Sequence, residues 1–185
     1  MYPKLKSFSG LSVAAAALMV SALPLLATVV LYVPLEEQAK TAEIIVVAAA
    51  GQGQSNWDAG GQLIFTDTRF EVQETVKGTV TGGVTTRQIG GTVGHIAQSV
   101  SGSPQFVSGR SYVLFLEPRP DGYYRVVGFN QGCYPVLTGR DGKRKVSPSL
   151  AGAEGVKLLG AAGAAAALPE PLADFLARVR ACLKP

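Results

Sequence analysis

The stretch Ile64-Phe65-Thr66-Asp67-Thr68-Arg69-Phe70-Glu71-Val72-Gln73 alternates between two kinds of side chain. The less polar set is Ile64, Thr66, Thr68, Phe70 and Val72, and the set that carries the charges is Phe65, Asp67, Arg69, Glu71 and Gln73. A period of two places one set on a core and the other in water along a β-strand, and a helix could not separate them in this way. The stretch therefore predicts a half-buried strand over 64–73.

Other segments typical of strands precede and follow this one in the sequence. They are short runs of β-branched and aromatic residues at 44–50, 84–89, 112–116, 123–129, 134–138 and 145–146. Asp121-Gly122 and Asp141-Gly142 supply the positive φ angles of tight turns and predict two hairpins. Five or six short strands with no helix between most of them predict a mainly all-β fold, an antiparallel barrel or sandwich.

Two helices are expected outside the strands. Pro34 opens a short one at 35–40, and Pro171 opens a C-terminal one within residues 170–185. The second has one apolar stripe, formed by Leu172, Phe175, Leu176, Val179, Cys182 and Leu183. We expect this stripe to dock on the barrel, with a partner or a membrane surface as the alternative. The Ala/Gly-rich segment 151–169 is interpreted as a connector between the body, 28–150, and this helix.

The first 27 residues have the composition of an export signal. No charged residue occurs between Lys6 and Glu36, and most of 11–33 is Ala, Val and Leu behind the basic start. Residues 1–27 are interpreted as a signal peptide, cleaved after Ala27 or Ala22, or as an uncleaved N-terminal membrane anchor, because 11–33 is long enough to cross a bilayer. Either outcome predicts an exported body, periplasmic or secreted, or anchored to the inner membrane with the barrel outside the cytoplasm.

The body, 28–150 with the segments that follow it, has a small positive net charge. Without the two lysines of 1–27, 15 basic residues face 13 acidic ones, a net charge of +2. The dense basic group, Arg140 with Lys143, Arg144 and Lys145, flanks a predicted turn and is interpreted as a solvated hairpin tip, with a weak polyanion contact as the alternative. We therefore expect no nucleic-acid partner.

The residues that carry chemistry are few. His95 is the one histidine, so no metal site, cofactor site or catalytic cluster is expected. Cys133 and Cys182 could form a disulfide in an oxidising compartment, or could be two separate buried thiols. A Cys133/His95 nucleophile pair would make the chain a cysteine-dependent enzyme, although no nucleophile motif surrounds either residue.

The segment from Gly90 to Gly109 is rich in Gly, Ser and Gln and is expected to be a long loop or broken strand. Loops of this length are frequent binding sites. The candidate binding residues in it are Gly91, His95, Gln98 and Gln105. Gly90-Gly91-Thr92-Val93-Gly94 lacks the Lys-Ser/Thr of a phosphate loop, so a nucleotide is not expected there.

Five aromatic residues lie on adjacent predicted strands: Tyr112, Tyr123, Tyr124, Phe129 and Tyr134. OB-type barrels use such faces to stack bases or sugars. Packing in the core is the preferred interpretation, and a short glycan or a peptide is the ligand expected if the face is exposed.

The strand and turn signatures resemble those of a group of small exported bacterial proteins of unknown role, over about residues 35–137. The segments that carry this resemblance are Ala42-Glu43-Ile44-Ile45-Val46-Val47, 70–78, Gln88-Ile89-Gly90-Gly91, 109–116 and 124–128. Their pattern is similar to an OB-type barrel, which netrin-like domains and tissue inhibitors of metalloproteinases also adopt. The resemblance implies an OB-like antiparallel barrel of five or six strands. Those inhibitors place an N-terminal cysteine on the protease metal, and this chain has none near the expected mature start.

These observations favour an exported, non-enzymatic binding module that contacts a protein or cell-envelope component through its rim loops. The alternative is a protease inhibitor or protease accessory factor, whose partner would be a secreted protease. Contact with a membrane is expected only through the N-terminal segment.

Overall fold

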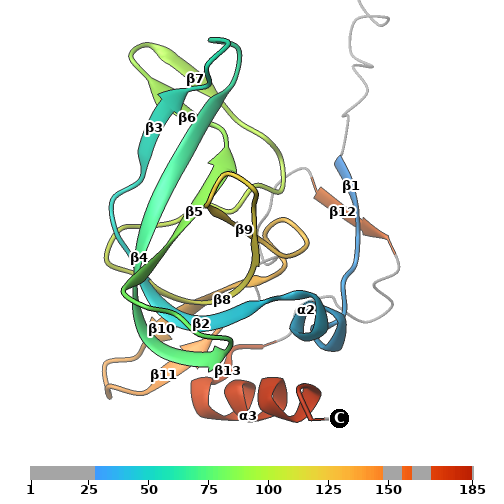
Figure 1. Ribbon diagram of the computed structural model, residues 1–185. Coiled ribbons are helices and arrows are strands. Elements are labelled where there is room, and N and C mark those ends of the chain that lie inside the picture. Colours follow the sequence, from blue (N-terminus) through green and yellow to red (C-terminus); the bar gives the residue numbers. More distant parts are fainter. Residues whose placement is uncertain (1–27, 148–155, 160–167, 185) are drawn as a thin grey trace, which may run out of the picture.

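The computed structural model describes residues 28–147, 156–159 and 168–184 (Figure 1). The predicted leader, 1–27, lies outside these residues, as does most of the predicted connector. Within the described ranges, no helix combines the length and the apolar character needed to cross a membrane.

Five strands close a barrel: β2 (Ile44–Ala50), β4 (Ile64–Lys77), β5 (Gly83–Ile89), β8 (Ser111–Pro118) and β9 (Tyr124–Val126). The pairing runs β2-β4-β5-β9-β8 and returns to β2. This order is the OB-type arrangement, so the expected barrel is confirmed. Four of the five pairings that close the barrel are antiparallel, and the fifth, between β5 and β9, is parallel.

The remaining strands extend the barrel in two directions. β3 (Gln54–Trp57), β6 (Gly91–Val93) and β7 (Ile96–Gln98) lie at the far end of β4, away from the helices (Figure 1). β10 (Cys133–Thr138), β11 (Arg144–Val146) and β13 (Glu170–Pro171) continue outward from β8. β1 (Thr28–Leu31) and β12 (Val156–Leu159) form a separate parallel pair, so part of the expected connector is a strand.

The expected loop or broken strand over 90–109 contains a hairpin in its first half. β6 and β7 pair antiparallel around the two-residue turn Gly94-His95, where Gly94 supplies the positive φ of 60°. Glycine content alone hides such a short hairpin, because three-residue strands carry almost no periodic pattern.

β2 and β8 are buried on both faces. Inside the barrel, alternate residues from both strands pack together: Ile44, Val46, Ala48 and Ala50 with Tyr112, Leu114 and Leu116. Outside it, Ile45 and Val47 pack with Val113 and Phe115 beneath the helices. Two-sided burial explains why both segments are apolar without interruption, whereas 64–73 alternates.

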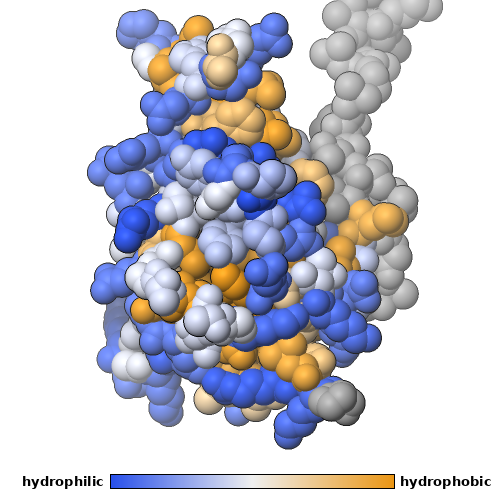
Figure 2. Space-filling model, viewed as in Figure 1, coloured by the Kyte–Doolittle hydropathy of each residue, from blue (hydrophilic) through white to orange (hydrophobic). Residues whose placement is uncertain are grey.

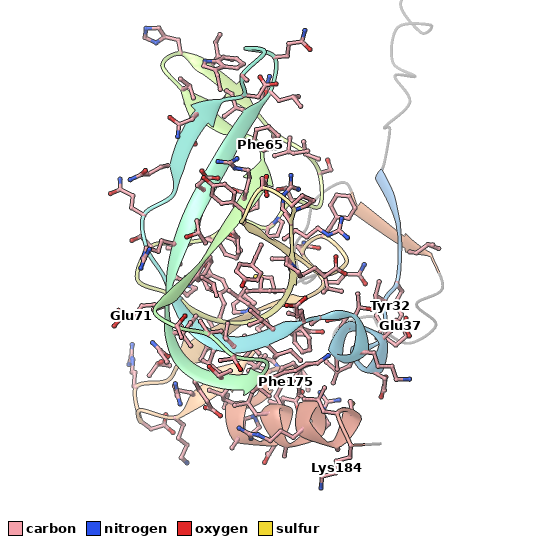
Figure 3. The ribbon with its side chains drawn as sticks, viewed as in Figure 1. Tyr32, Glu37, Phe65, Glu71, Phe175 and Lys184 are labelled. Carbon is pink, nitrogen blue, oxygen red and sulfur yellow. The ribbon has the colours of Figure 1, made fainter. Side chains whose placement is uncertain are left out.

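The helices cover the outer core. α2 (Leu35–Thr41) and α3 (Leu172–Cys182) both contribute to it, and Phe175 lies on the side of α3 that faces the sheet (Figure 3). The ring centroids of Phe175 and Tyr134 are 4.7 Å apart. The predicted stripe of α3 is thus confirmed as a docking face on the barrel.

Two buried glutamines hold the segment that precedes α2. Gln131 accepts from the Val33 N–H at 2.8 Å and donates to the Leu31 carbonyl at 2.8 Å, so its amide pairs with the backbone as a neighbouring strand would. Gln38 donates to the Val33 carbonyl at 2.7 Å and accepts from the Tyr134 hydroxyl at 2.9 Å. We call Gln131 and Gln38 the amide clamp.

Lys77 caps the C-terminal end of α2 from the end of β4. Its ammonium donates to the carbonyls of Ala39, Lys40 and Ala42 at 2.7, 3.1 and 2.5 Å. A cation at this end also interacts favourably with the helix dipole.

Replacing Lys77 with Met should therefore lower the free energy of unfolding by about 1–3 kcal/mol, because partly buried carbonyls lose their donor. Urea denaturation checks this value. Lys40→Met is the matched control, since Lys40 is an exposed lysine of α2, the helix that Lys77 caps, and it should change stability by less than about 0.5 kcal/mol. Equal effects of the two substitutions would contradict the capping role.

Candidate functional site

A cavity of about 380 Å³ opens between β5, β9 and the loop after β7. This volume is in the range of sites that hold small ligands or single large side chains. We call it the seam pocket; it is lined by Arg87, Gln88, Ile89, Val100, Ser103, Pro104, Glu117, Arg119, Arg125, Val126, Gly128 and Phe129. On the face shown in Figure 2, hydrophobic residues lie in separate patches among polar ones.

The pocket lies where the barrel is closed most weakly. β5 pairs with β4 continuously from Gly83 to Ile89, but it pairs with β9 at one position, Thr86 with Tyr124. Beyond that position residues of both strands line the cavity. The pocket is thus a gap in the barrel wall between two strands that close the barrel at one residue pair.

Phe129 forms one wall in an unfavourable conformation. Its φ is 62°, and it is the one non-glycine residue with positive φ in the described ranges. Its side chain is nevertheless 53% exposed, so packing does not compensate for the strain. A left-handed conformation costs a bulky residue about 1–3 kcal/mol, and such strain concentrates at functional sites.

Two residues of β5 have buried polar atoms without a partner among the residues that the structure describes. Thr86 and Gln88 point into the barrel from β5, and within the described part of the chain neither the Thr86 hydroxyl oxygen nor the Gln88 amide nitrogen has a hydrogen-bond partner. Gln88 also lines the seam pocket. A buried donor without a partner costs about 1–3 kcal/mol, which a bound acceptor would recover.

The arginines at the rim each have a carboxylate partner. Arg87 donates to both oxygens of Asp67, at 2.7 and 2.6 Å, and its guanidinium lies 3.6 Å from the ring centroid of Tyr123. The hydrogen bond to Asp67 is the main cause that raises the pKa of Arg87, so this cation is permanent.

The other two rim arginines are paired in the same way. Arg125 contacts Glu117 at 2.5 Å, and Arg119 contacts Asp121 at 3.2 Å. The bond from Arg119 is the largest cause that lowers the pKa of Asp121. The rim is therefore charge-balanced and does not select a charged ligand.

The structure places the four predicted loop residues apart from this pocket. Gly91 pairs with Gln98 in the β6–β7 hairpin, and His95 is exposed at its turn. Gln98 has a structural contact: its side-chain Oε1 accepts from the Ile64 N–H at 2.6 Å. Gln105 is exposed in the loop that follows. The residues of this loop that line the pocket are Val100, Ser103 and Pro104 instead.

Both cysteines are free thiols, so of the two alternatives the structure has separate thiols and no Cys133–Cys182 disulfide. Cys133 belongs to the cluster inside the barrel, whereas Cys182 packs against the cluster outside it, so the β2–β8 sheet separates the two side chains. Burial raises the pKa of the Cys133 thiol, which disfavours the thiolate that a nucleophile needs. His95 lies in the turn between β6 and β7, and these strands lie far from β10 (Figure 1). Among the described residues, no three His, Cys, Asp or Glu side chains gather as metal ligands.

The raised pKa of Cys133 predicts that the free energy of unfolding depends on pH. Below about pH 8 the Cys133 thiol is protonated in both states, whereas above the unfolded pKa of about 8.5 the unfolded chain loses a proton that the folded chain keeps. The free energy of unfolding should fall between pH 8 and 10, with a slope approaching about 1.4 kcal/mol per pH unit from this group. In a Cys182→Ala background, adding Cys133→Ala should remove this component in urea titrations. An unchanged slope would contradict burial of the thiol.

Sequence reasoning missed the main residues of the pocket. Of the five aromatics expected in the core, Tyr112 is buried and Phe129 is exposed. The position of Phe129 after Gly128 in a tight connection was the available signal, but Phe is not a residue type associated with positive φ.

No family model matches the chain, and no curated protein and no solved structure shows significant similarity to it. The barrel is therefore established by its strand pairing, and the seam pocket by its own geometry.

Proposed function

We propose that this chain is an exported, non-enzymatic binding module that holds a segment of a protein or cell-envelope partner in the seam pocket. The observation that carries the proposal is Phe129, a large apolar side chain held in a strained conformation and left exposed beside the cavity. Folding alone gains nothing from this arrangement, so a partner that covers the ring is its best physical explanation.

The walls of the pocket support a partner with a large apolar side chain. Ile89, Val100 and Phe129 are 43%, 38% and 53% exposed and line the same cavity. Burying such surface is the main source of affinity in protein recognition, and aromatic anchors dominate it. The paired arginines at the rim argue against a polyanion such as nucleic acid as the partner.

A secreted protease is the alternative partner, as the netrin-like resemblance implies. The cysteine wedge of those inhibitors has no counterpart here, because the first cysteine of the chain is the buried Cys133. An inhibitor of this type would have to act through the seam pocket or the exposed β6–β7 end.

Replacing Phe129 with Asn separates binding from folding. Asn tolerates positive φ, so Phe129→Asn should raise the free energy of unfolding by about 1 kcal/mol while it removes the apolar wall. Peptides selected from a random phage-displayed library on the wild-type protein should bind this variant at least about tenfold more weakly.

Leu137→Ala is the control for loss of an exposed apolar side chain. Leu137 is 42% exposed on β10 and does not line the pocket, so this variant should keep wild-type affinity for the selected peptides. Failure to enrich any peptide, or equal binding by wild type and Phe129→Asn, would refute the proposed function.

A further inference from the structure

We infer that the occupant of the seam pocket is an extended, uncharged segment of a protein that pairs with the open edge of β5 as an added strand. The inference rests on the proposed function and names its mode of recognition. It is carried by the direction of the β5 backbone groups, by one unpartnered side-chain donor and by the charge balance of the rim.

The β5 edge faces the pocket with backbone groups. Gly90 N–H donates to the Ile64 carbonyl at 2.8 Å, which places the even-numbered residues of β5 in the hydrogen-bonded pairs with β4. The odd-numbered residues Arg87 and Ile89 therefore direct their N–H and C=O groups to the opposite side. The Ile89 carbonyl shows this direction, because it accepts from the Ser103 hydroxyl at 3.1 Å.

β9 pairs with this edge at one position. The ladder between the two strands consists of Thr86 with Tyr124, and a parallel bridge at this position uses no group of β5 beyond the Arg87 N–H. The Arg87 carbonyl and the Ile89 N–H thus point from the strand edge toward the cavity that both residues line. An acceptor and a donor two residues apart on one strand are the groups that a peptide strand pairs with in β-augmentation.

The side chains around the edge add a requirement for the segment. Gln88 offers an amide N–H with no partner in the described part of the chain, and it fits a carbonyl oxygen of the segment. Phe129 and Val100 provide an apolar contact for one large side chain. Since Arg87, Arg119 and Arg125 already contact carboxylates, the segment needs no charge of its own.

The test uses N-methylation of peptides selected on the full chain by phage display. If the peptide is an added strand, single backbone N-methyl groups should weaken binding about tenfold or more at alternate positions and change it little between them. Alanine substitution should identify one large apolar side chain as the anchor. Loss of binding at positions spaced three or four apart would indicate a helical occupant and overturn the inference.

Amide hydrogen exchange of the protein gives a second readout. Ile89 N–H should exchange rapidly in the free protein and become protected when the selected peptide is added, whereas Gln88 N–H, which faces β4, should be protected in both states. An Ile89 amide whose exchange does not change with bound peptide would also overturn the inference.

Gln88→Met tests the side-chain donor with nearly the same volume. It should weaken peptide binding about fivefold or more and leave the fold at least as stable, because a buried donor without a partner is removed. Unchanged affinity would show that Gln88 does not contact the segment. If peptides bind through Phe129 but fail these backbone tests, the proposed function stands and the added-strand inference falls.

Discussion

The antiparallel pairing of β2 with β8 is the constraint on which the rest of the structure depends. Each residue from Ile44 to Ala49 pairs with a residue of β8, and successive side chains enter two different cores. The barrel interior and the layer under α3 are therefore two sides of one ladder. A disturbance of this ladder removes support from both layers at once. This explains why neither strand has a charged residue within the paired region, Ile44 to Ala49 on β2 and Ser111 to Leu116 on β8.

The long β2–β8 pairing contrasts with the short β5–β9 pairing beside the seam pocket. The barrel is held by long antiparallel pairings on β4 and β8 and by a single residue pair between β5 and β9. Stability is thus concentrated away from the pocket, and the pocket wall contains the strained Phe129 and the unsatisfied Gln88. Binding sites commonly retain such local defects because the fold is stable enough elsewhere to tolerate them.

Sequence reasoning reached the barrel because its signals are local. The alternation over 64–73 and the Asp-Gly turns at 121–122 and 141–142 depend on residues that are neighbours in the chain. The parallel closure of β5 on β9 depends on residues far apart in sequence, and the β6–β7 hairpin is too short to show a period. Phe129 and Ile89 come together at one pocket through backbone geometry and strand register, which residue type does not reveal.

The amide clamp restrains the backbone that leads into α2. Gln131 bonds to the Leu31 carbonyl and the Val33 N–H, and Gln38 bonds to the Val33 carbonyl, so three hydrogen bonds restrain the backbone at 31–33. A flexible linker without such bonds would let the barrel rotate freely about its attachment. An attachment at the N-terminal side would thus leave the barrel little freedom to swivel about residues 31–33, and a partner would meet the pocket from a restricted range of directions.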